Sequence, residues 1–103
     1  MTLTELRYIV AVAREKHFGR AAEACFVSQP TLSVAIKKLE EELDVKLFER
    51  GASEVSVTPL GEQIVRQAQQ VIEQAAAICA ALPPFVSSIG LFVNASAEEV
   101  SAV

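Results

Sequence analysis

The sequence has little of what secreted or metal-binding domains of this size depend on. Its 103 residues include two cysteines, Cys25 and Cys79, and one histidine, His17. Two cysteines are too few for a disulfide-stapled secreted domain, and neither has a partner at metal-ligand spacing. Cys25 lies in the apolar context AACFV and is interpreted as a small buried residue, while His17 is expected to end a helix. We therefore expect no disulfide framework, no metal and no cofactor.

Long apolar runs are also missing. Although 51% of the residues are hydrophobic and the mean hydropathy is +0.35, no run approaches the ~18 residues of a membrane span. The first segment, MTLTELRYIVAVAREKHF, carries charge throughout, unlike a signal peptide. These absences argue against a membrane protein and predict a cytoplasmic location.

The chain has no excess of positive charge, and its net charge of −4 argues against a nucleic-acid partner if it is taken as a whole. The acidic excess, however, belongs to residues 51–103, which hold one basic residue, Arg66, and five acidic ones. Residues 1–50 hold eight of each kind and are neutral. A local basic face in the first half therefore remains compatible with the composition.

Helical periodicity dominates what is present. Thr2-Leu3-Thr4-Glu5 has the spacing of a capping box, and the helix that it starts should run to about residue 16. A shorter helix follows in RAAEACF. Ser28 is a good N-cap for a third helix, with Pro30 in its first turn. That helix has a narrow core stripe made of Leu32, Ile36, Leu39 and Leu43.

The outward side of the third helix carries few charges near its start. Val34 points away from the core stripe, between Pro30 and the pair Lys37 and Lys38. Two helices joined by a tight turn favour a helix-turn-helix, in which the second helix enters the major groove. There Gln29 suits an adenine edge, Thr31 and Ser33 suit a base or a phosphate, Val34 a thymine methyl group, and the two lysines phosphates. The alternative is an ordinary helix start followed by a solvated lysine pair.

After Asp44 the pattern changes. VKLFER (45–50) and EVSVT (54–58) predict a two-stranded hairpin, and Thr58-Pro59 starts a fourth helix that should continue to about Ala81. Some 20 residues of helix span about 30 Å, so we expect part of it to project rather than to pack wholly on the core. Its apolar band predicts dimerisation through Ile64, Ala68, Val71, Ile72, Ala75 and Ile78.

From Leu3 to about Ala76 the chain resembles the N-terminal domain of LysR-type transcriptional regulators. Five motifs stand in the order and spacing of that family: FGRAA (18–22), VSQPTLS (27–33), IKKLEEEL (36–43), LFER (47–50) and TPLG (58–61). The blocks EKHFGRAA and SQPTLSVAIKKLEEEL resemble most the peroxide-responsive OxyR branch. The resemblance implies a mostly α fold: a winged helix-turn-helix of three helices and a two-stranded wing over residues 1–58, then a linker and dimerisation helix over 59–81.

The resemblance also implies a function. It predicts sequence-specific binding of double-stranded DNA by a homodimer, or a tetramer in full-length proteins, at an inverted repeat, and transcriptional regulation, including activation of oxidative-stress genes. The helix-turn-helix would run from Phe18 to Lys37. The DNA-binding residues would be Arg20, Ser28, Gln29, Pro30, Thr31, Ser33, Val34, Lys37, Lys38 and Arg50. The wing tip GASEV departs from the family pattern because it lacks a basic residue and contains Glu54, which would repel phosphate.

The last segment differs from a LysR-type linker. Residues 82–103 contain Pro83-Pro84, a strand-like SSIGLFV (87–93) and an expected helix start at Ser96, so we expect a poorly ordered or foreign tail. The sequence LPPFV followed by IGLFVN resembles a short piece of phosphoribosylanthranilate isomerase. A (β/α)₈ barrel needs ~200 residues or more, so this piece cannot be such an enzyme.

An enzyme and a protein-interaction module are the two other classes of function. An enzyme is not expected, because no neighbourhood of the sequence combines paired carboxylates, a nucleophile with a base, or a phosphate loop. A winged helix that serves only as a protein-interaction module is the alternative to a DNA-binding domain. The salt dependence of DNA binding distinguishes the two, because phosphate contacts give a steep log–log slope.

Overall fold

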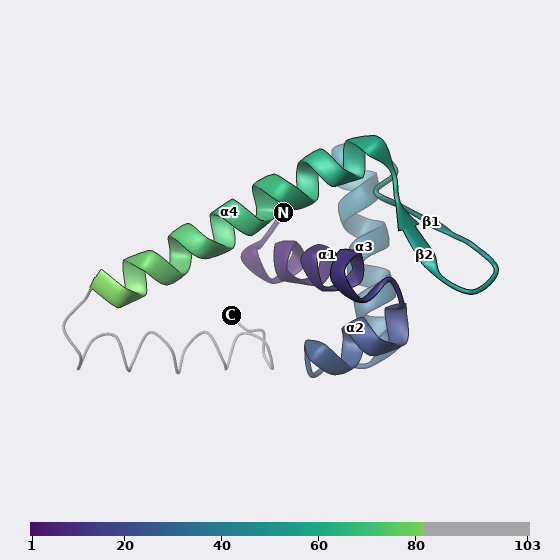
Figure 1. Ribbon diagram of the computed structural model, residues 1–103, viewed down its shortest axis with the longest axis horizontal. Helices are drawn as coiled ribbons and strands as arrows, with labels where there is room; N and C mark the ends of the chain where they lie inside the picture. The colour runs from purple at the N-terminus through teal and green to yellow at the C-terminus, as the bar shows by residue number, and fades with distance from the viewer. Residues whose placement is uncertain (82–103) are drawn as a thin grey trace.

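The computed structural model describes residues 1–81, which form four helices and one two-stranded antiparallel sheet (Figure 1). In chain order the elements are α1 (Leu3–Glu15), α2 (Phe18–Ala24), α3 (Gln29–Leu43), β1 (Phe48–Arg50), β2 (Val55–Val57) and α4 (Pro59–Ala81). The predicted fold class, a three-helix domain with a wing and a long fourth helix, is confirmed. The expectations for residues 82–103 lie outside the described part of the chain.

Side chains cap the helices where the sequence predicts. The Thr2 hydroxyl accepts a hydrogen bond from the Glu5 N–H at 3.1 Å, and the Glu5 carboxylate accepts one from the Thr2 N–H at 2.9 Å. At the start of α3 the Ser28 hydroxyl accepts from the Thr31 N–H at 3.3 Å. Each cap satisfies backbone donors that a helix leaves unpaired at its N-terminus. The predicted capping box and the predicted start of α3 are therefore confirmed.

The expected role of His17 is wrong. His17 does not end α1; it is the N-cap of α2, and its Nδ1 atom accepts a hydrogen bond from the Arg20 N–H at 3.0 Å. α1 instead ends at Glu15, and its C-cap is Lys16, whose backbone is left-handed with φ of 56°. An imidazole nitrogen can accept from a free helix N–H as a hydroxyl oxygen does, which explains why α2 can start at this residue.

The turn of the helix-turn-helix begins with a left-handed residue. At the end of α2 the Val27 N–H donates to the Ala22 carbonyl at 3.0 Å, and the Phe26 N–H donates to the Glu23 carbonyl at 3.1 Å. These two bonds form a Schellman motif, in which glycine is usual at the position that Phe26 occupies. Phe26 has φ of 60°, and 83% of its surface is exposed. The chain thus turns towards α3 through a strained backbone, with an aromatic ring in solvent.

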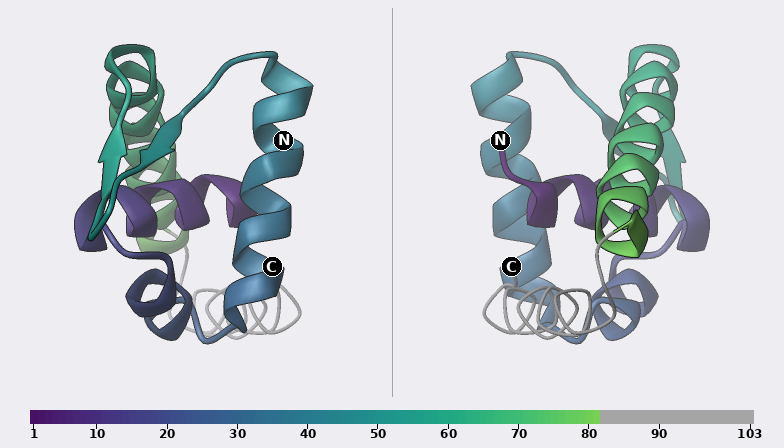
Figure 2. Two further views of the ribbon diagram at one scale, coloured as in Figure 1. Left: turned by 90° about the vertical axis from the view of Figure 1, so that its right-hand side faces the viewer. Right: turned by 90° about the vertical axis from the view of Figure 1, so that its left-hand side faces the viewer.

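The core lies where α1 crosses the other helices. Figure 2 shows α3 and α4 on two sides of the domain with α1 running between them, and α1 packs against both. Three of the four predicted stripe residues of α3 are buried, and Leu43 is half-buried. The largest fully buried side chains come from α1, α3 and the loop before the wing: Ile9, Val12, Leu32, Leu39 and Leu47.

The wing is shorter than predicted and is tied to the domain at its base. β1 pairs with β2 so that Phe48 faces Val57 and Arg50 faces Val55. Residues 45–47 do not belong to the strand, because the Val45 N–H donates to the Glu40 carbonyl oxygen at 3.1 Å instead of to a partner strand. The Val55 N–H donates to the Lys16 carbonyl at 3.1 Å, so the wing also joins the end of α1.

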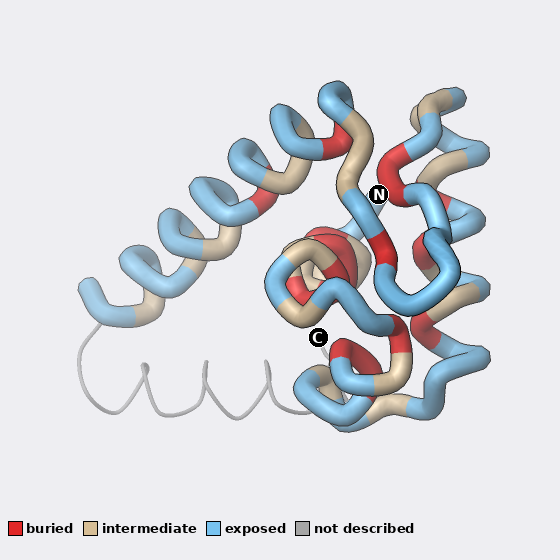
Figure 3. Tube along the Cα trace, turned by 45° about the vertical axis from the view of Figure 1, so that its right-hand side comes forward, coloured by how far each residue is buried: buried red, intermediate tan, exposed pale blue. Residues whose placement is uncertain are grey.

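α4 begins on the domain and then leaves it (Figure 1). Of its 23 residues only Gly61 and Ala68 are buried, and Figure 3 shows the rest as half-buried or exposed. Ile64 and Ile72 pack against the core, whereas Val71 and Ile78 are 49% and 64% exposed. Among residues 1–81 no helix has the length and apolar character needed to cross a membrane. The expectation that α4 projects with apolar side chains in solvent is confirmed.

Candidate nucleic-acid interface

The exposed face of α3 is built around Val34. This side chain is 65% exposed and lies between two groups of α3 residues. Ser33 and Lys37 lie with it in a cleft towards the wing, while Pro30, Thr31 and Lys38 lie with it in a shallow groove on the other flank. A valine at the centre of an exposed helix face, framed by hydroxyls and lysines, provides a surface for apolar and polar contact together.

Ser28 and Thr31 form a pair at the start of this face. The Ser28 hydroxyl donates to Thr31 Oγ1 at 2.8 Å and accepts from the Thr31 N–H. The Ser28 hydroxyl therefore both donates and accepts within the helix cap. The Thr31 oxygen accepts from Ser28, which leaves its own hydroxyl proton for donation outwards. Thr31 is therefore better suited than Ser28 to donate to a ligand, and Gln29 lies exposed beside both residues.

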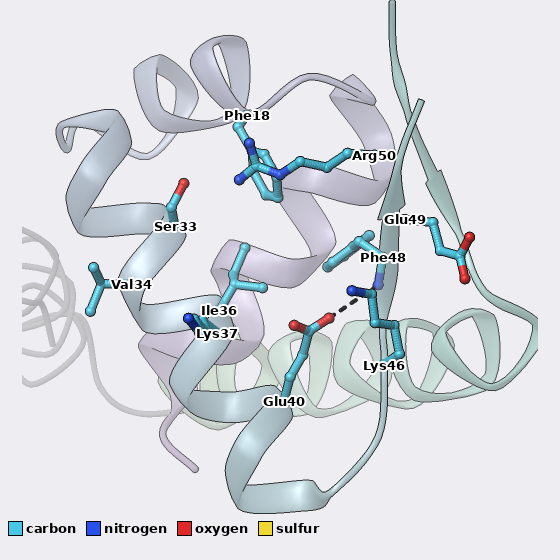
Figure 4. A pocket seen from close by; sticks show the side chains of 10 residues that line it. All are labelled: Phe18, Ser33, Val34, Ile36, Lys37, Glu40, Lys46, Phe48, Glu49 and Arg50. Atoms are coloured by element: carbon cyan, nitrogen blue, oxygen red, sulfur yellow. Dashed lines mark hydrogen bonds between the residues drawn. The ribbon is translucent and has the colours of Figure 1, made fainter. Parts of the chain in front are cut away.

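A cleft of about 680 Å³ separates α3 from the wing (Figure 4). One wall is α3, with Ser33, Val34 and Lys37, and the other wall includes Lys46 and Arg50. Lys37, Lys46 and Arg50 border the cleft together with two carboxylates, Glu40 and Glu49, so cations are in excess there although the whole chain is acidic. The basic face allowed for the first half of the chain is located here, where it would attract phosphate.

Arg50 is held in place by an aromatic ring. Its guanidinium carbon lies 4.1 Å from the centroid of the Phe18 ring, and that ring meets the Phe48 ring edge-on at a centroid distance of 6.4 Å. Figure 4 shows the Arg50 side chain extending from the wing over Phe18. A cation over an aromatic face is attracted by the quadrupole of the ring. Phe18, buried at the start of α2, therefore fixes a charge of the wing at the edge of the cleft.

Arg20 takes a different direction. One of its terminal nitrogens donates to the Glu15 carbonyl oxygen at 3.2 Å, and its Nε lies 3.9 Å from the Glu15 carboxylate. Its guanidinium is therefore turned to the C-terminal end of α1. The side chain is 60% exposed. It does not line the cleft between α3 and the wing, which gathers Ser33, Val34, Lys37 and Arg50.

The two cysteines lie away from this face. Cys25 is half-buried in a pocket between α1, the end of α2 and α4, lined also by Tyr8, Arg14 and Ile72. Burial raises the pKa of the Cys25 thiol, an effect that Arg14 and Arg7 partly oppose. A thiol with a raised pKa is a poor nucleophile. No cluster of residues within the described part of the chain has the composition of a metal site.

Besides the cation Lys46, two residues that hold the cleft together were not predicted as parts of a site, namely Phe18 and Glu40. Phe18 was placed only as the start of the helix-turn-helix, and Glu40 was one glutamate in the run EEE (40–42). Glu40 lines the floor of the cleft, and its Oε2 atom accepts hydrogen bonds from the Leu47 and Phe48 N–H groups. The only signal in the sequence was their place in the motifs FGRAA and IKKLEEEL.

With this geometry established, comparison with known proteins decides the family. The sequence profile described as "Bacterial regulatory helix-turn-helix protein, lysR family" matches residues 3–62. The chain belongs to this family. The matched residues of this LysR-family chain contain the whole of α1, α2, α3 and the wing, and the first residues of α4. The resemblance seen in the sequence is thereby confirmed.

Relatives of this LysR-family chain include peroxide-related regulators. It is 49% identical over 74 residues to the hydrogen peroxide-inducible genes activator of Pectobacterium carotovorum, covering 72% of this chain and 24% of the relative. Among solved structures, full-length OxyR C199D from Pseudomonas aeruginosa is 69% identical, with a TM-score of 0.72 over 76% of this chain and 26% of that one. The chain thus spans about a quarter of the length of these relatives.

A solved complex with DNA has the same fold. The DNA-binding domain of BenM, in a complex with benA site 1 DNA, superimposes on this LysR-family chain with a TM-score of 0.74 and 39% identity. The match covers 78% of this chain and 90% of the BenM domain. The winged helix-turn-helix of this chain is therefore of the type found in DNA-binding domains of the family.

Proposed function

We propose that this chain is the DNA-binding part of a LysR-type transcriptional regulator and reads double-stranded DNA by sequence. The observation that carries the proposal is the face of α3 around Val34, which joins an exposed apolar side chain to hydroxyls and lysines beside the cationic cleft. The similarity to the BenM domain that was solved with DNA supports it independently. The proposed location is the cytoplasm of a bacterium.

Each residue of this face has a proposed role that follows from its chemistry. Gln29 can pair with an adenine edge, Val34 can contact a thymine methyl group, and Thr31 can donate a hydrogen bond to a base or phosphate. Lys37 and Lys38 neutralise phosphates, which adds affinity and fixes register without reading sequence. Pro30 and Ser33 border the same surface. Ser28 supports it through its hydrogen bonds to Thr31.

We expect the wing to contact DNA through Arg50 and not through the residues at the tip of the wing. Arg50 borders the cleft, where its charge suits the DNA backbone or the minor groove. The tip residues 51–54 are exposed and include Glu54, which disfavours contact with phosphate. Arg20, directed to the end of α1, is proposed as a peripheral contact.

We further propose a homodimer formed through α4. Val71 and Ile78 are the exposed apolar side chains of the predicted band, so they are the proposed centre of the contact. Ala75 would flank them, while Ile64, Ala68 and Ile72 support the helix from the inner side. A two-fold dimer matches an inverted repeat, because each recognition helix then reads one half-site. In this arrangement residues 1–58 read DNA and residues 59–81 join two copies.

The relatives suggest which genes are regulated. One of them is named as an activator of hydrogen peroxide-inducible genes, and another is OxyR. We propose that the protein to which this chain belongs regulates oxidative-stress genes and is not an enzyme. Neither Cys25 nor Cys79 is assigned a sensing role, because the known similarity covers only the DNA-binding quarter of those relatives.

The test is a fluorescence-anisotropy titration of a LysR-type inverted-repeat duplex and a scrambled duplex over a salt series. The proposal expects tighter binding to the repeat and an affinity that falls linearly on a log–log plot against salt. Lys37→Ala should weaken both duplexes similarly, whereas Arg66→Ala, which removes an equal charge from exposed α4, should leave both unchanged. Salt-independent binding, or no binding, would refute the proposal and favour a protein-interaction module.

A further inference from the structure

The segment that leads into the wing is hydrogen-bonded on one side to α3 and on the other side to the start of α4. Residues 46–48 lead from α3 into β1, and the Leu47 side chain is fully buried. On the α3 side, Oε2 of Glu40 accepts hydrogen bonds from the Leu47 N–H at 2.8 Å and the Phe48 N–H at 3.2 Å. Figure 4 shows the second of these bonds crossing the floor of the cleft. A single carboxylate oxygen therefore binds the two amides that begin the wing.

The same segment is held from the α4 side through its carbonyl oxygens. The Thr58 N–H donates to the Leu47 carbonyl at 3.0 Å, and the Thr58 hydroxyl donates to the Lys46 carbonyl at 2.6 Å. Gly61 packs so closely that a β carbon there would overlap with the Leu47 carbonyl oxygen. The Thr58 and Gly61 contacts thus hold the carbonyl side of the segment, and the Glu40 bonds add to the packing of Leu47 in holding its N–H side against α3.

These bonds matter for the wing because the wing has little stability of its own. A two-stranded sheet with three residues in each strand is marginal in water unless other elements hold it. Arg50 lies only two residues after Phe48, so a displacement at Phe48 would carry Arg50 away from Phe18 and from the cleft. Hydrogen bonds to an ionised acceptor are the stronger kind, which suits Glu40 to this task.

We propose that Glu40 is a positioning residue for DNA binding: it touches no DNA, but it fixes the wing so that Arg50 reaches the DNA backbone together with Lys37. This inference rests on the proposed function. It also explains why a carboxylate lies on the floor of a cationic cleft. Its charge is directed to two backbone N–H groups rather than to the phosphates that the cleft would receive.

The first experiment measures the salt slope of binding for a set of variants. Because each phosphate contact contributes about 0.9 to the slope of log K against log salt, Arg50→Ala should lower it by about one. Glu40→Asp keeps the charge but is one methylene shorter, and it should lower the slope equally. Combining it with Arg50→Ala should add nothing further. Glu40→Gln should retain the wild-type slope, because its side-chain oxygen can accept both bonds.

Glu41→Ala is the matched control, because Glu41 is the exposed neighbour on the same helix. It changes the charge of α3 without touching the wing and should leave the slope unchanged. A second measurement, amide hydrogen exchange by NMR on the free protein, checks the mechanism. The Leu47 and Phe48 amides should be protected in the wild type and in Glu40→Gln. In Glu40→Asp they should exchange at least tenfold faster while the amides of α1 keep their protection.

The outcomes separate the two proposals. If the wild type binds both duplexes equally but with a steep salt slope, sequence reading fails while the Glu40 effect is still measurable on either duplex. A folded Glu40→Asp protein with wild-type slope and wild-type exchange would overturn the positioning role. Loss of slope in Glu41→Ala as large as in Glu40→Asp would also overturn it, because the effect would then not depend on the hydrogen bonds that Glu40 makes to the wing.

Discussion

Replacement of Phe26 by glycine or asparagine should stabilise the protein, although it removes an aromatic side chain. Phe26 has φ of 60° at the left-handed position of the Schellman motif. This conformation costs a residue with a β carbon about 1–2 kcal/mol, and glycine or asparagine adopts it more easily. Because the side chain is 83% exposed, its removal forfeits little buried apolar area. Burial of the ring therefore contributes too little free energy to offset the backbone strain.

The size of the effect follows from these terms. Phe26→Gly relieves the strain but adds about 0.5–1 kcal/mol of conformational entropy to the unfolded state, so the net gain is about 0.5–1 kcal/mol. Phe26→Asn relieves part of the strain without that entropy and should gain a similar amount. For a domain of this size, about 1 kcal/mol shifts the Tm by roughly 4–8 °C.

The assay is thermal and urea unfolding followed by circular dichroism, at one fixed protomer concentration because dimerisation would also change the Tm. Phe26→Ala is the matched control: it removes the ring but keeps the β carbon, so its stability should stay near that of the wild type. If Phe26→Asn and Phe26→Gly both unfold at or below the wild-type temperature while Phe26→Ala is neutral, the strain argument is refuted.

Three other predictions follow from the site and the core. Val34→Ala should reduce discrimination between the inverted repeat and the scrambled duplex by about 1 kcal/mol, as competition titrations can measure, whereas Lys37→Ala should leave discrimination intact. Gly61→Ala should lower the free energy of unfolding in urea by about 1–3 kcal/mol, because its methyl group overlaps with the Leu47 carbonyl, whereas Leu60→Ala beside it should cost much less. The pKa of Cys25 is raised in the folded state, so the unfolded thiol ionises at a lower pH than the folded one. The free energy of unfolding should therefore fall as the pH rises above about 8.5. Cys25→Ala should flatten that fall in unfolding curves measured between pH 7 and 9.5.

Local signals in the sequence predicted most of the helices. Ser28 before Pro30 identified the start of α3, and the spacing of Leu32, Ile36 and Leu39 identified its buried side. Both depend on neighbours within one or two turns, which a sequence displays directly. The exposed position of Val34 was predicted for the same reason. Such features need no knowledge of distant parts of the chain.

Features that depend on distant contacts could not be predicted. Residues 45–47 have the composition of a strand, but the Val45 and Leu47 N–H groups bond to Glu40 rather than to a partner strand. Nothing in the run EEE distinguishes Glu40 from its two neighbours until the fold brings the wing against α3. Arg50 and Phe18 are 32 positions apart in the chain and meet only in the folded domain. His17 was misjudged because its cap role depends on ring orientation rather than on residue type.

The length of α4 matters because this helix has one side packed on the domain and another side exposed to solvent. Ala68 packs against the domain while Val71 and Ile78 face outwards, so the length of this helix sets how the proposed dimer contact is placed relative to the domain. Inserting a single residue between Ala68 and Val71 would rotate the outer side chains by about 100° around the helix axis and advance them by about 1.5 Å. In the proposed dimer, the spacing between the two recognition helices would then change together with the surface that contacts the second copy. An insertion of about seven residues, which is two whole turns, would instead keep the outer side chains at nearly the same angle. We therefore expect natural insertions in α4, and fusions of this domain to another protein, to tolerate steps of this length best.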